Sequence, residues 1–236
     1  MDILYELKSK SDEKRAIFTA KLVPNVERER FLGLKTAEVD EIAKRLVKSG
    51  GYEAFLSEKH YYFEEFGLHA DILCRLKYET KEELCSSIEN FLPLVNNWAV
   101  CDSLAQGMKG IKKYPTFFRE KCKEWIASED TFKARFGVVV LLSYFLDEAF
   151  DERDLSLLAK IDRNEFYLQM ALAWYWSVAL VKQYEKAVPY FEKRMIKDEW
   201  VHNKGIQKAR ESFRVSNERK AYLNALKLPK SKNRKS

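Results

Sequence analysis

The chain has 236 residues and a formal net charge of +6, and 46% of its residues are hydrophobic. This length and composition allow a sizeable core, so intrinsic disorder is not the expected state. Only 8 glycines and 5 prolines are present, which disfavours turn-rich β architecture and favours helices.

The N-terminal segment, Met1 to Arg15, is charged from its second residue and lacks the apolar core of a signal peptide. The longest apolar run, residues 136–146, is far shorter than the roughly 20 residues that cross a bilayer. We therefore expect no membrane segment and a cytoplasmic location.

Two helices have clear end signals. Thr36 precedes an amphipathic stretch, residues 39–47, that stops at Gly50. Thr80 with Glu83 has the pattern of a capping box, and Pro93 ends the helix that follows. Apolar periodicity then predicts further helices over residues 96–109, 116–127, 131–146, 155–161, 165–183, 187–196, 199–212 and 218–226.

Helix pairs recur at a regular spacing. Pairs that begin near Thr80, Tyr114, Asp151 and Tyr184 are separated by about 33 to 37 residues, the range of helical solenoid repeats. Stacking such pairs would bury their apolar faces and form a concave surface for a large partner. The expected fold is an all-α, HEAT-like superhelix over residues 1–227 as one domain, followed by a basic tail, 228–236; a compact helical bundle is the alternative.

The basic residues are concentrated at one end of the chain. Residues 204–236 contain eleven Lys or Arg against Glu211 and Glu218, so the preceding part carries a net negative charge. A basic patch suits a polyanion such as nucleic acid. A solvated helix and tail kept soluble by lysines is the alternative, and for charge runs in general it is the commoner case.

The four cysteines are spaced too widely for zinc pairs. We expect Cys74, Cys85, Cys101 and Cys122 to be reduced thiols on helices, with neither a structural metal nor a cofactor.

The helix predicted over residues 96–109 carries unusual side chains off its core stripe. Its period places Val100, Cys101, Leu104 and Met108 on the buried face, and Trp98, Asp102 and Lys109 on another. A tryptophan with a carboxylate four residues on is typical of a recognition surface. The alternative is that Trp98 packs on a neighbouring helix pair while Asp102 stays in solvent.

Two further positions stand out. Arg135 begins a strongly apolar helix, where a cation near amide donors can hold a phosphate. A buried ion pair with Glu129 or Asp130 is the alternative. Trp174 and Trp176 lie in a segment apolar on nearly every side, so periodicity does not indicate which of them is exposed.

Four short segments carry a resemblance to a known family. Residues 97–103 (NWAVCDS), 133–138 (KARFGV) and 170–174 (MALAW) resemble signature stretches of the AlkD-like DNA alkylation repair glycosylases, in the same order. Residues 31–36 (FLGLKT) resemble that family's N-terminal motif. The resemblance departs after Thr36, where the family often has proline and a basic residue but this chain has Ala37 and the acidic Asp40 and Glu41. The region before the motif is also short, so DNA-contacting helices there are expected to be reduced or absent.

The resemblance implies a site and a reaction. Asp102 matches the catalytic aspartate, Trp98 and Trp174 match two cleft tryptophans, and Arg135 matches a cleft arginine; Lys109 and Thr36 are further candidates for DNA contact. These side chains would converge in one basic groove. The implied activity is hydrolysis of the N-glycosidic bond of N-alkylated purines in duplex DNA by a monomer, without a snug base pocket and without strand cleavage.

Two alternatives remain on the sequence alone. One is a non-catalytic member of the superfamily that binds damaged or branched DNA. The other is a protein-binding helical scaffold, since solenoids often hold peptides.

Overall fold

The structure is a computed structural model that describes residues 2–229, and within them every regular element is helical. The α-helices are α1 (Ile3–Ser9), α2 (Glu13–Leu22), α3 (Thr36–Ser49), α4 (Tyr52–Ser57), α5 (Phe63–Arg75), α6 (Lys81–Phe91), α7 (Trp98–Gly107), α8 (Pro115–Ile126), α9 (Thr131–Tyr144), α10 (Glu152–Ala159), α11 (Phe166–Lys182), α12 (Tyr184–Glu192), α13 (Glu199–Glu211) and α14 (Asn217–Ala225). Short 3₁₀ helices, η1 to η3, cover Arg28–Arg30, Leu92–Leu94 and Lys109–Lys113. The expected all-α, HEAT-like class of fold is confirmed.

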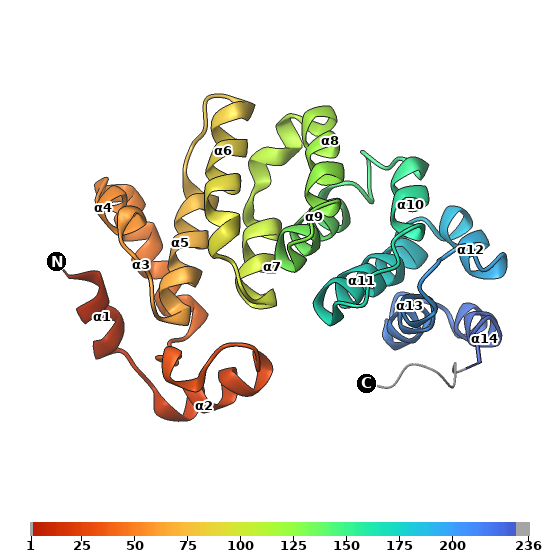
Figure 1. The fold of residues 1–236 in the computed structure, drawn as a ribbon, viewed down its shortest axis with the longest axis horizontal. Helices are drawn as coiled ribbons and strands as arrows, with labels where there is room; N and C mark the ends of the chain where they lie inside the picture. Colours follow the sequence, from red (N-terminus) through yellow and green to blue (C-terminus); the bar gives the residue numbers. More distant parts are fainter. Residues whose placement is uncertain (1, 230–236) are drawn as a thin grey trace. The chain divides into compact units, whose positions relative to one another are not determined.

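The helices form two compact units, Met1–Glu120 and Lys121–Ser236, with the boundary inside α8. Helix pairs begin at Lys81, Pro115, Glu152 and Tyr184, close to the spacing predicted from the sequence (Figure 1). The expected basic tail begins after α14, and its residues 230–236 lie outside the described part of the chain.

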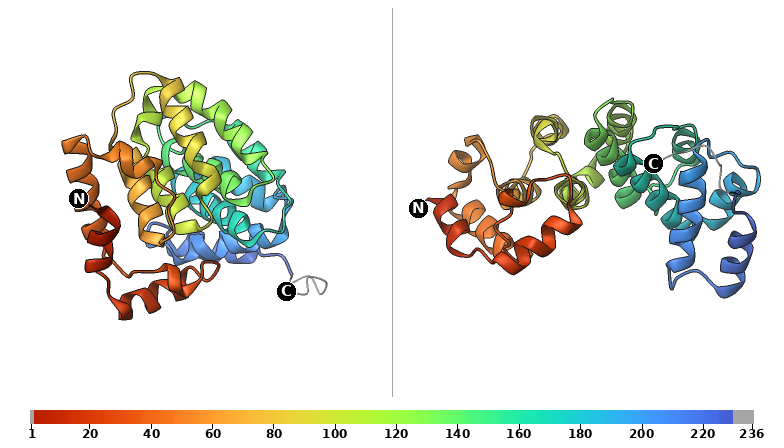
Figure 2. Two further views of the ribbon diagram at one scale, coloured as in Figure 1. Left: turned by 60° about the vertical axis from the view of Figure 1, so that its left-hand side comes forward. Right: turned by 60° about the horizontal axis from the view of Figure 1, so that its bottom comes forward.

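In the first unit, α3, α5 and α7 lie side by side as one layer, with α4 packed against α3 and α5, and α6 against α5 (Figures 1 and 2). Their facing stripes supply a core that includes Ile42, Leu46, Leu68 and Ile72, with Leu7 from α1. Helix α3 is amphipathic because its apolar side, which includes Ile42 and Leu46, faces this core while its other side faces solvent.

In the second unit, α9, α11 and α13 lie side by side, with α12 packed on α11 and α14 on α13. Neighbours on several sides explain why α11 is apolar almost all round. Gly137 in α9 allows close approach to α8, since a Cβ there would lie 2.8 Å from Ile126 Cγ1 and 3.0 Å from the Cys122 carbonyl oxygen. The sequence of α9 thus fixes how tightly this pair of helices packs.

Most helix ends follow the sequence signals. Gly50 ends α3 in the left-handed conformation with φ of 74°, and the Thr80 hydroxyl accepts a 3.1 Å hydrogen bond from the Glu83 amide. Thr36, however, is the first residue of α3 and not its cap. The cap is Lys35, whose amide donates to the Glu38 carboxylate at 2.7 Å.

All eight helices predicted from periodicity after residue 95 are present with ends shifted by a few residues. Helices α1, α2, α4 and α5 were not predicted individually. Two of them, α1 and α2, show that short helices do precede the Phe31–Thr36 motif.

The Phe31–Thr36 motif is held by one buried carboxylate. Glu64, in the first turn of α5, accepts hydrogen bonds from the amides of Leu32 (2.9 Å), Gly33 (2.6 Å) and Leu34 (3.3 Å). Gly33 has φ of 85°, and a Cβ there would lie 2.1 Å from the Asp12 carbonyl oxygen. Only glycine therefore fits this position. The motif lies between α2 and α3 in the chain, and Glu64 fixes it to α5.

A pair of buried histidines lies between the α4–α5 connection and α5. His60 Nε2 and His69 Nδ1 share a hydrogen bond of 2.8 Å, and His69 stacks on Phe91 with ring centroids 4.2 Å apart. Burial, with a smaller contribution from His60, lowers the pKa of His69 to about 3. Burial also lowers the pKa of His60, against the opposing effect of the Glu65 and Glu58 carboxylates. Both rings are therefore neutral in the folded protein at neutral pH.

No helix in the described residues is long and apolar enough to cross a membrane.

Glu64→Ala should lower the free energy of unfolding by about 3 kcal/mol or more, because it leaves buried amides without an acceptor at about 1–3 kcal/mol each. Urea unfolding at pH 7 measures this change. Glu41→Ala, an exposed position on α3, is the control and should change stability by less than about 0.5 kcal/mol. Equal effects of the two substitutions would contradict the role assigned to Glu64.

Stability should fall as the pH drops below about 6.5, because unfolded histidine binds a proton there while folded His69 does so only near pH 3. At pH 4 this one group should cost about 3 kcal/mol. His69→Gln should remove that part of the loss, as measured by urea unfolding at pH 7 and pH 4. Parallel losses in the two proteins would count against a buried neutral His69.

Candidate functional site

Helix α7 carries the first group of candidate residues. Its N-cap is Asn97, whose side chain accepts a 3.0 Å hydrogen bond from the Val100 amide. The predicted core stripe is confirmed, since Val100, Cys101, Leu104 and Met108 are all buried. Trp98 and Asp102 are one helical turn apart on an adjacent stripe.

Trp98 is half-buried and packs on α2. Its indole N–H donates a 2.9 Å hydrogen bond to the Leu22 carbonyl oxygen. The ring also joins a small cluster that contains Ala16, Val23 and Phe31. Trp98 therefore packs on neighbouring residues, as one of the two sequence interpretations expected. The residue is nevertheless only partly buried.

Asp102 is buried, with 6% of its surface exposed. It lies at the edge of the core face of α7, since Cys101 and Ala105 are fully buried while Ser103 and Gln106 are exposed. The expectation that Asp102 stays in solvent if Trp98 packs is wrong.

The other two candidates of the first unit lie apart from this stripe. Helix α7 ends at Gly107, so Lys109 is exposed at the start of η3 and is not on the predicted face. Thr36 is exposed at the first turn of α3.

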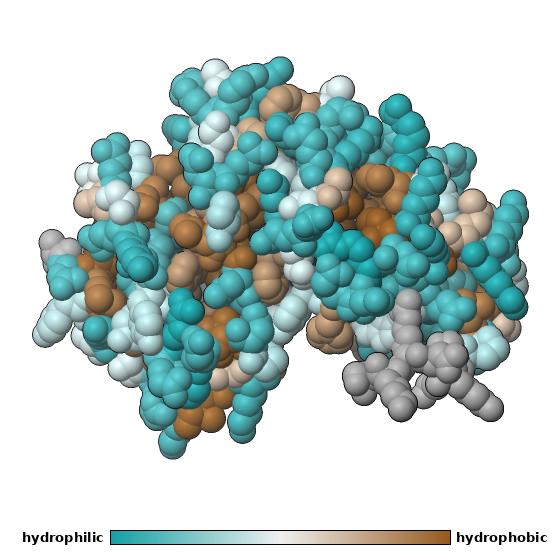
Figure 3. Space-filling view, in the orientation of Figure 1, coloured by the Kyte–Doolittle hydropathy of each residue, from teal (hydrophilic) through white to brown (hydrophobic). Residues whose placement is uncertain are grey.

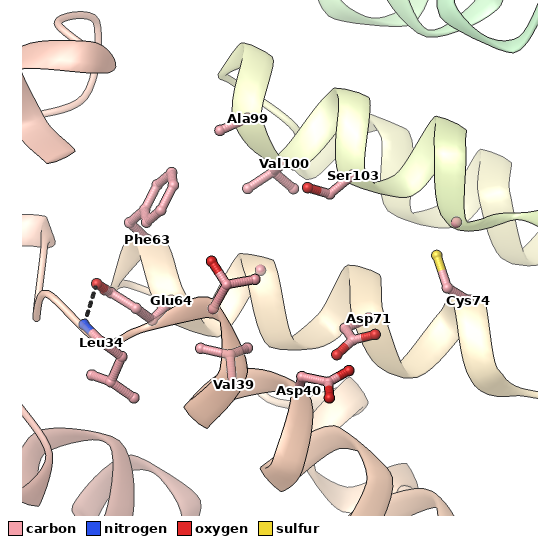
Figure 4. A pocket seen from close by; sticks show the side chains of 13 residues that line it. Leu34, Val39, Asp40, Phe63, Glu64, Asp71, Cys74, Ala99, Val100 and Ser103 are labelled. Atoms are coloured by element: carbon pink, nitrogen blue, oxygen red, sulfur yellow. Dashed lines mark hydrogen bonds between the residues drawn. The ribbon is translucent and has the colours of Figure 1, made fainter. Parts of the chain in front are cut away.

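Thr36 lines a cavity of about 310 Å³ between α3, α5 and α7 (Figure 4). Val39 and Asp40 from α3 and Asp71 from α5 also face it. Its charged lining side chains are carboxylates that already have partners, since Asp40 pairs with Lys44 and Arg75, and Asp71 pairs with Arg75.

Arg135 lies in the second unit, in the second turn of α9. The side chain is only 5% exposed, and Nη1 donates a 2.6 Å hydrogen bond to the Tyr167 carbonyl oxygen on α11. This hydrogen bond joins the Arg135 side chain to the backbone of α11. With 5% of its surface exposed, Arg135 is not an open phosphate ligand in this structure.

Trp174 is the accessible tryptophan of α11. Trp176 is fully buried, and its ring lies 5.6 Å from Phe191 in the core. Trp174 is half-buried and faces a groove of about 320 Å³ between α11 and α13. The remaining residues of the groove come from α11, α13 and the segment after it: Ser177, Val178, Val181, Lys208, Glu211, Ser212 and Arg214.

The charge beside Trp174 is mainly positive. Lys208 is half-buried, and burial lowers its pKa, with repulsion from Lys204 and Arg135 acting in the same direction and Glu211 opposing. Cations that repel one another in a partly desolvated groove are stabilised by a bound anion. The second unit therefore presents the Trp174 indole beside two cationic side chains, Lys208 and Arg214.

Lys208 and Arg214 are functional candidates that the sequence did not single out. Both fall within the basic region from Lys204 onward, but composition alone did not distinguish them from the other nine cations there. Only the packing of α13 on α11 places these two next to Trp174. Glu64 and Asp71 were missed because helix α5, which carries both, was not predicted from the sequence.

Both units expose an indole beside charged side chains on a layer of adjacent helices (Figure 3 shows the mixed polar and apolar surface). These features define a helical protein that exposes aromatic and charged side chains on its surface. Comparison with family models then gives the family. The chain belongs to the DNA alkylation repair enzyme family, whose model matches residues 3–178.

Membership of this family indicates DNA as a partner and an enzymatic role in repair. A search of curated proteins found no match. The matched region includes Trp98, Asp102, Arg135 and Trp174, whereas Lys208 and Arg214 lie beyond it.

Lys208→Gln and Arg214→Gln should each weaken binding to duplex DNA irrespective of sequence. Each should also reduce the slope of log K against log salt concentration by about 0.9, the value for one lost phosphate contact. Fluorescence anisotropy with a labelled duplex at four salt concentrations measures both. Lys193→Gln, an exposed cation after α12, should leave affinity and slope unchanged. If all three variants behave alike, the groove beside Trp174 does not contact phosphate.

Proposed function

We propose that this chain is a DNA glycosylase that hydrolyses the N-glycosidic bond of N-alkylated purines, such as 3-methyladenine or 7-methylguanine, in duplex DNA. The observation that carries the proposal is the carboxylate of Asp102 one helical turn from the half-buried indole of Trp98, in a chain of the DNA alkylation repair enzyme family. The proposal names the reaction within that family and the residues that perform it.

The chemistry needs little more than a placed carboxylate. An N-alkylated purine carries positive charge, so it leaves as a neutral base with the electron pair of the glycosidic bond, and no general acid is required. Positive charge develops on the deoxyribose, where a fixed carboxylate stabilises it and orients the attacking water. The water adds its hydroxyl to the sugar carbon and releases its proton to solvent.

The low exposure of Asp102 limits the access of a sugar to its carboxylate, but it also strengthens the charge that a bound sugar would meet. A charge at the edge of a core interacts more strongly with a developing cation than one in bulk water, because the local dielectric is lower. The neighbouring indole of Trp98 contributes a π face, which attracts cationic character on the sugar. Its hydrogen bond to Leu22 fixes the ring, so little conformational entropy is lost when substrate binds.

In the second unit, Trp174 would pack on sugar and backbone, and Lys208 and Arg214 would contact phosphate. Arg135 would act through its charge on this groove, since its side chain is anchored on the Tyr167 carbonyl. Because these contacts are made to the DNA backbone, catalysis does not require a snug pocket for the base. We expect a monomer that uses no cofactor, hydrolyses the glycosidic bond and leaves the strand uncut.

A second candidate function is DNA binding without catalysis. The low exposure of Asp102 and the acidic residues that follow Thr36 favour it, while the retained Trp98, Arg135 and Trp174 are common to both candidates. A protein-binding scaffold would use the helical stack without the basic groove.

Asp102→Asn should lower the rate of purine release from methylated duplex DNA by about 100-fold to 1000-fold, the range for removal of one transition-state charge contact. Its affinity for the same duplex should change by less than about twofold. Single-turnover release assays and anisotropy measure the two quantities. Asp147→Asn, at an exposed ion pair with Lys182, is the matched control and should release purine at the wild-type rate.

Other results would support the rivals. Salt-dependent DNA binding without release by either wild type or variant would indicate a non-catalytic DNA-binding protein. If Asp102→Asn retains both DNA binding and purine release, this aspartate is not the catalytic group. Absence of both binding and release in wild type would leave the scaffold.

A further inference from the structure

Phe213, in the connection between α13 and α14, is the most exposed large hydrophobic side chain of residues 2–229. The residue exposes 102% of its reference surface, and the next, Tyr5, exposes 72%. No side chain in that part of the chain therefore covers the ring. A single exposed apolar residue is common on protein surfaces and indicates nothing by itself. The surroundings of Phe213 decide whether the ring has a role.

The connection that carries Phe213 is anchored on both sides. Ser212 ends α13, and its hydroxyl accepts a 3.2 Å hydrogen bond from the Arg214 amide. Val215 is buried, and the side chain of Ser216 caps α14. Phe213 thus projects from a short turn whose two ends are fixed. A ligand that meets the ring therefore loses little affinity to ordering of the backbone.

The residues on either side of Phe213 line the groove beside Trp174. Both Ser212 and Arg214 border this groove, and Lys208 from α13 lies in it with them. Trp174 is half-buried there, so one aromatic ring lies in the groove and a second, fully exposed ring lies at its rim. Aromatic and cationic side chains are thus combined within one part of the second unit.

The charge at this rim favours an anionic partner. Residues 204–214 carry one carboxylate, Glu211, and four cationic side chains, Lys204, Lys208, Arg210 and Arg214. The Glu211 carboxylate accepts a 2.9 Å hydrogen bond from the Gln207 side chain one turn earlier. A free phosphate would pair with the cations but leave Phe213 in water. A nucleic acid supplies both phosphates for the cations and flat bases on which an aromatic ring stacks.

We propose that Phe213 is an apolar wedge that enters duplex DNA between adjacent base pairs, while Lys208 and Arg214 contact the neighbouring phosphates. Side chains of this kind partly unstack a base step and kink the duplex by about 20–90°. The inference rests on the proposed function for its ligand, duplex DNA. It adds a DNA-contacting residue outside residues 3–178, the region that the family model matches. The wedge needs no base pocket, because the ring enters the stack and no base leaves it.

Phe213→Ala tests the wedge in the full-length chain. It should weaken binding to a labelled duplex about 5-fold to 150-fold, the range for the loss of one stack on a base. The slope of log K against log salt concentration should stay unchanged, because no charge is removed. Fluorescence anisotropy at several salt concentrations measures both quantities.

Bending of the DNA is the second readout. Energy transfer between dyes at the two ends of a short duplex should rise when wild type binds, because a kink brings the ends together. The rise should be lost in Phe213→Ala and retained in Phe213→Leu, since leucine also acts as a wedge in other minor-groove binders. Tyr5→Ala, which removes an exposed ring from α1, is the matched control and should bind and bend DNA like wild type.

Several results would overturn the wedge. These are an unchanged affinity in Phe213→Ala, a wild-type complex without bending, and equal effects of Phe213→Ala and Tyr5→Ala. Self-association that is lost in Phe213→Ala while DNA binding is kept, as measured by sedimentation, would assign the ring to a contact between copies of the chain. Thermal unfolding confirms that Phe213→Ala is folded, as expected for an exposed position.

Purine release from methylated duplex DNA is measured with the same proteins. Release by wild type together with unaltered DNA binding by Phe213→Ala overturns the wedge alone. Bending that depends on Phe213 without release by wild type overturns the glycosylase proposal alone.

Discussion

The Glu64 carboxylate is the interaction on which the first unit depends. It accepts three consecutive backbone amides of the Phe31–Thr36 motif, and this positions the start of α3 relative to α5. Leu32 and Leu34 thereby enter the core with Leu7, and Phe31 enters the cluster that supports Trp98. A buried charge is stable here because several charge-assisted hydrogen bonds replace its water. The same residue lines the cavity between α3, α5 and α7, so one contact organises both the fold and this cavity.

The two units place different side chains on one kind of helical scaffold. In the first, neighbouring helices enclose a cavity whose carboxylates, Asp40, Glu64 and Asp71, pair with Lys44, Arg75 and backbone amides. In the second, Lys208 and Arg214 surround a half-buried indole, which suits phosphate and sugar.

Particular residues show where sequence reasoning was sufficient. The spacing of helix pairs, the glycine end of α3 and the core stripe of α7 follow from local rules and are present as predicted. The helix α5 was not predicted because Tyr62 is not a usual cap and Gly67 and His69 weaken its helical pattern. Trp98 and Arg135 were correctly chosen as unusual, yet their partners, the Leu22 and Tyr167 carbonyl groups, lie 76 and 32 residues away.

The sequence by itself determined the all-helical class, the repeat spacing, the family and the chemical types of the candidate residues. These depend on periodicity, caps and short motifs, which are properties of neighbouring residues. Tertiary structure alone decided that Trp174 and not Trp176 is accessible, that Asp102 is nearly buried, and that Lys208 and Arg214 lie beside Trp174. It also revealed the cavity around Gly67. Burial and electrostatic surroundings are set by contacts between helices distant in sequence, and no local pattern specifies which side chains those contacts bring together.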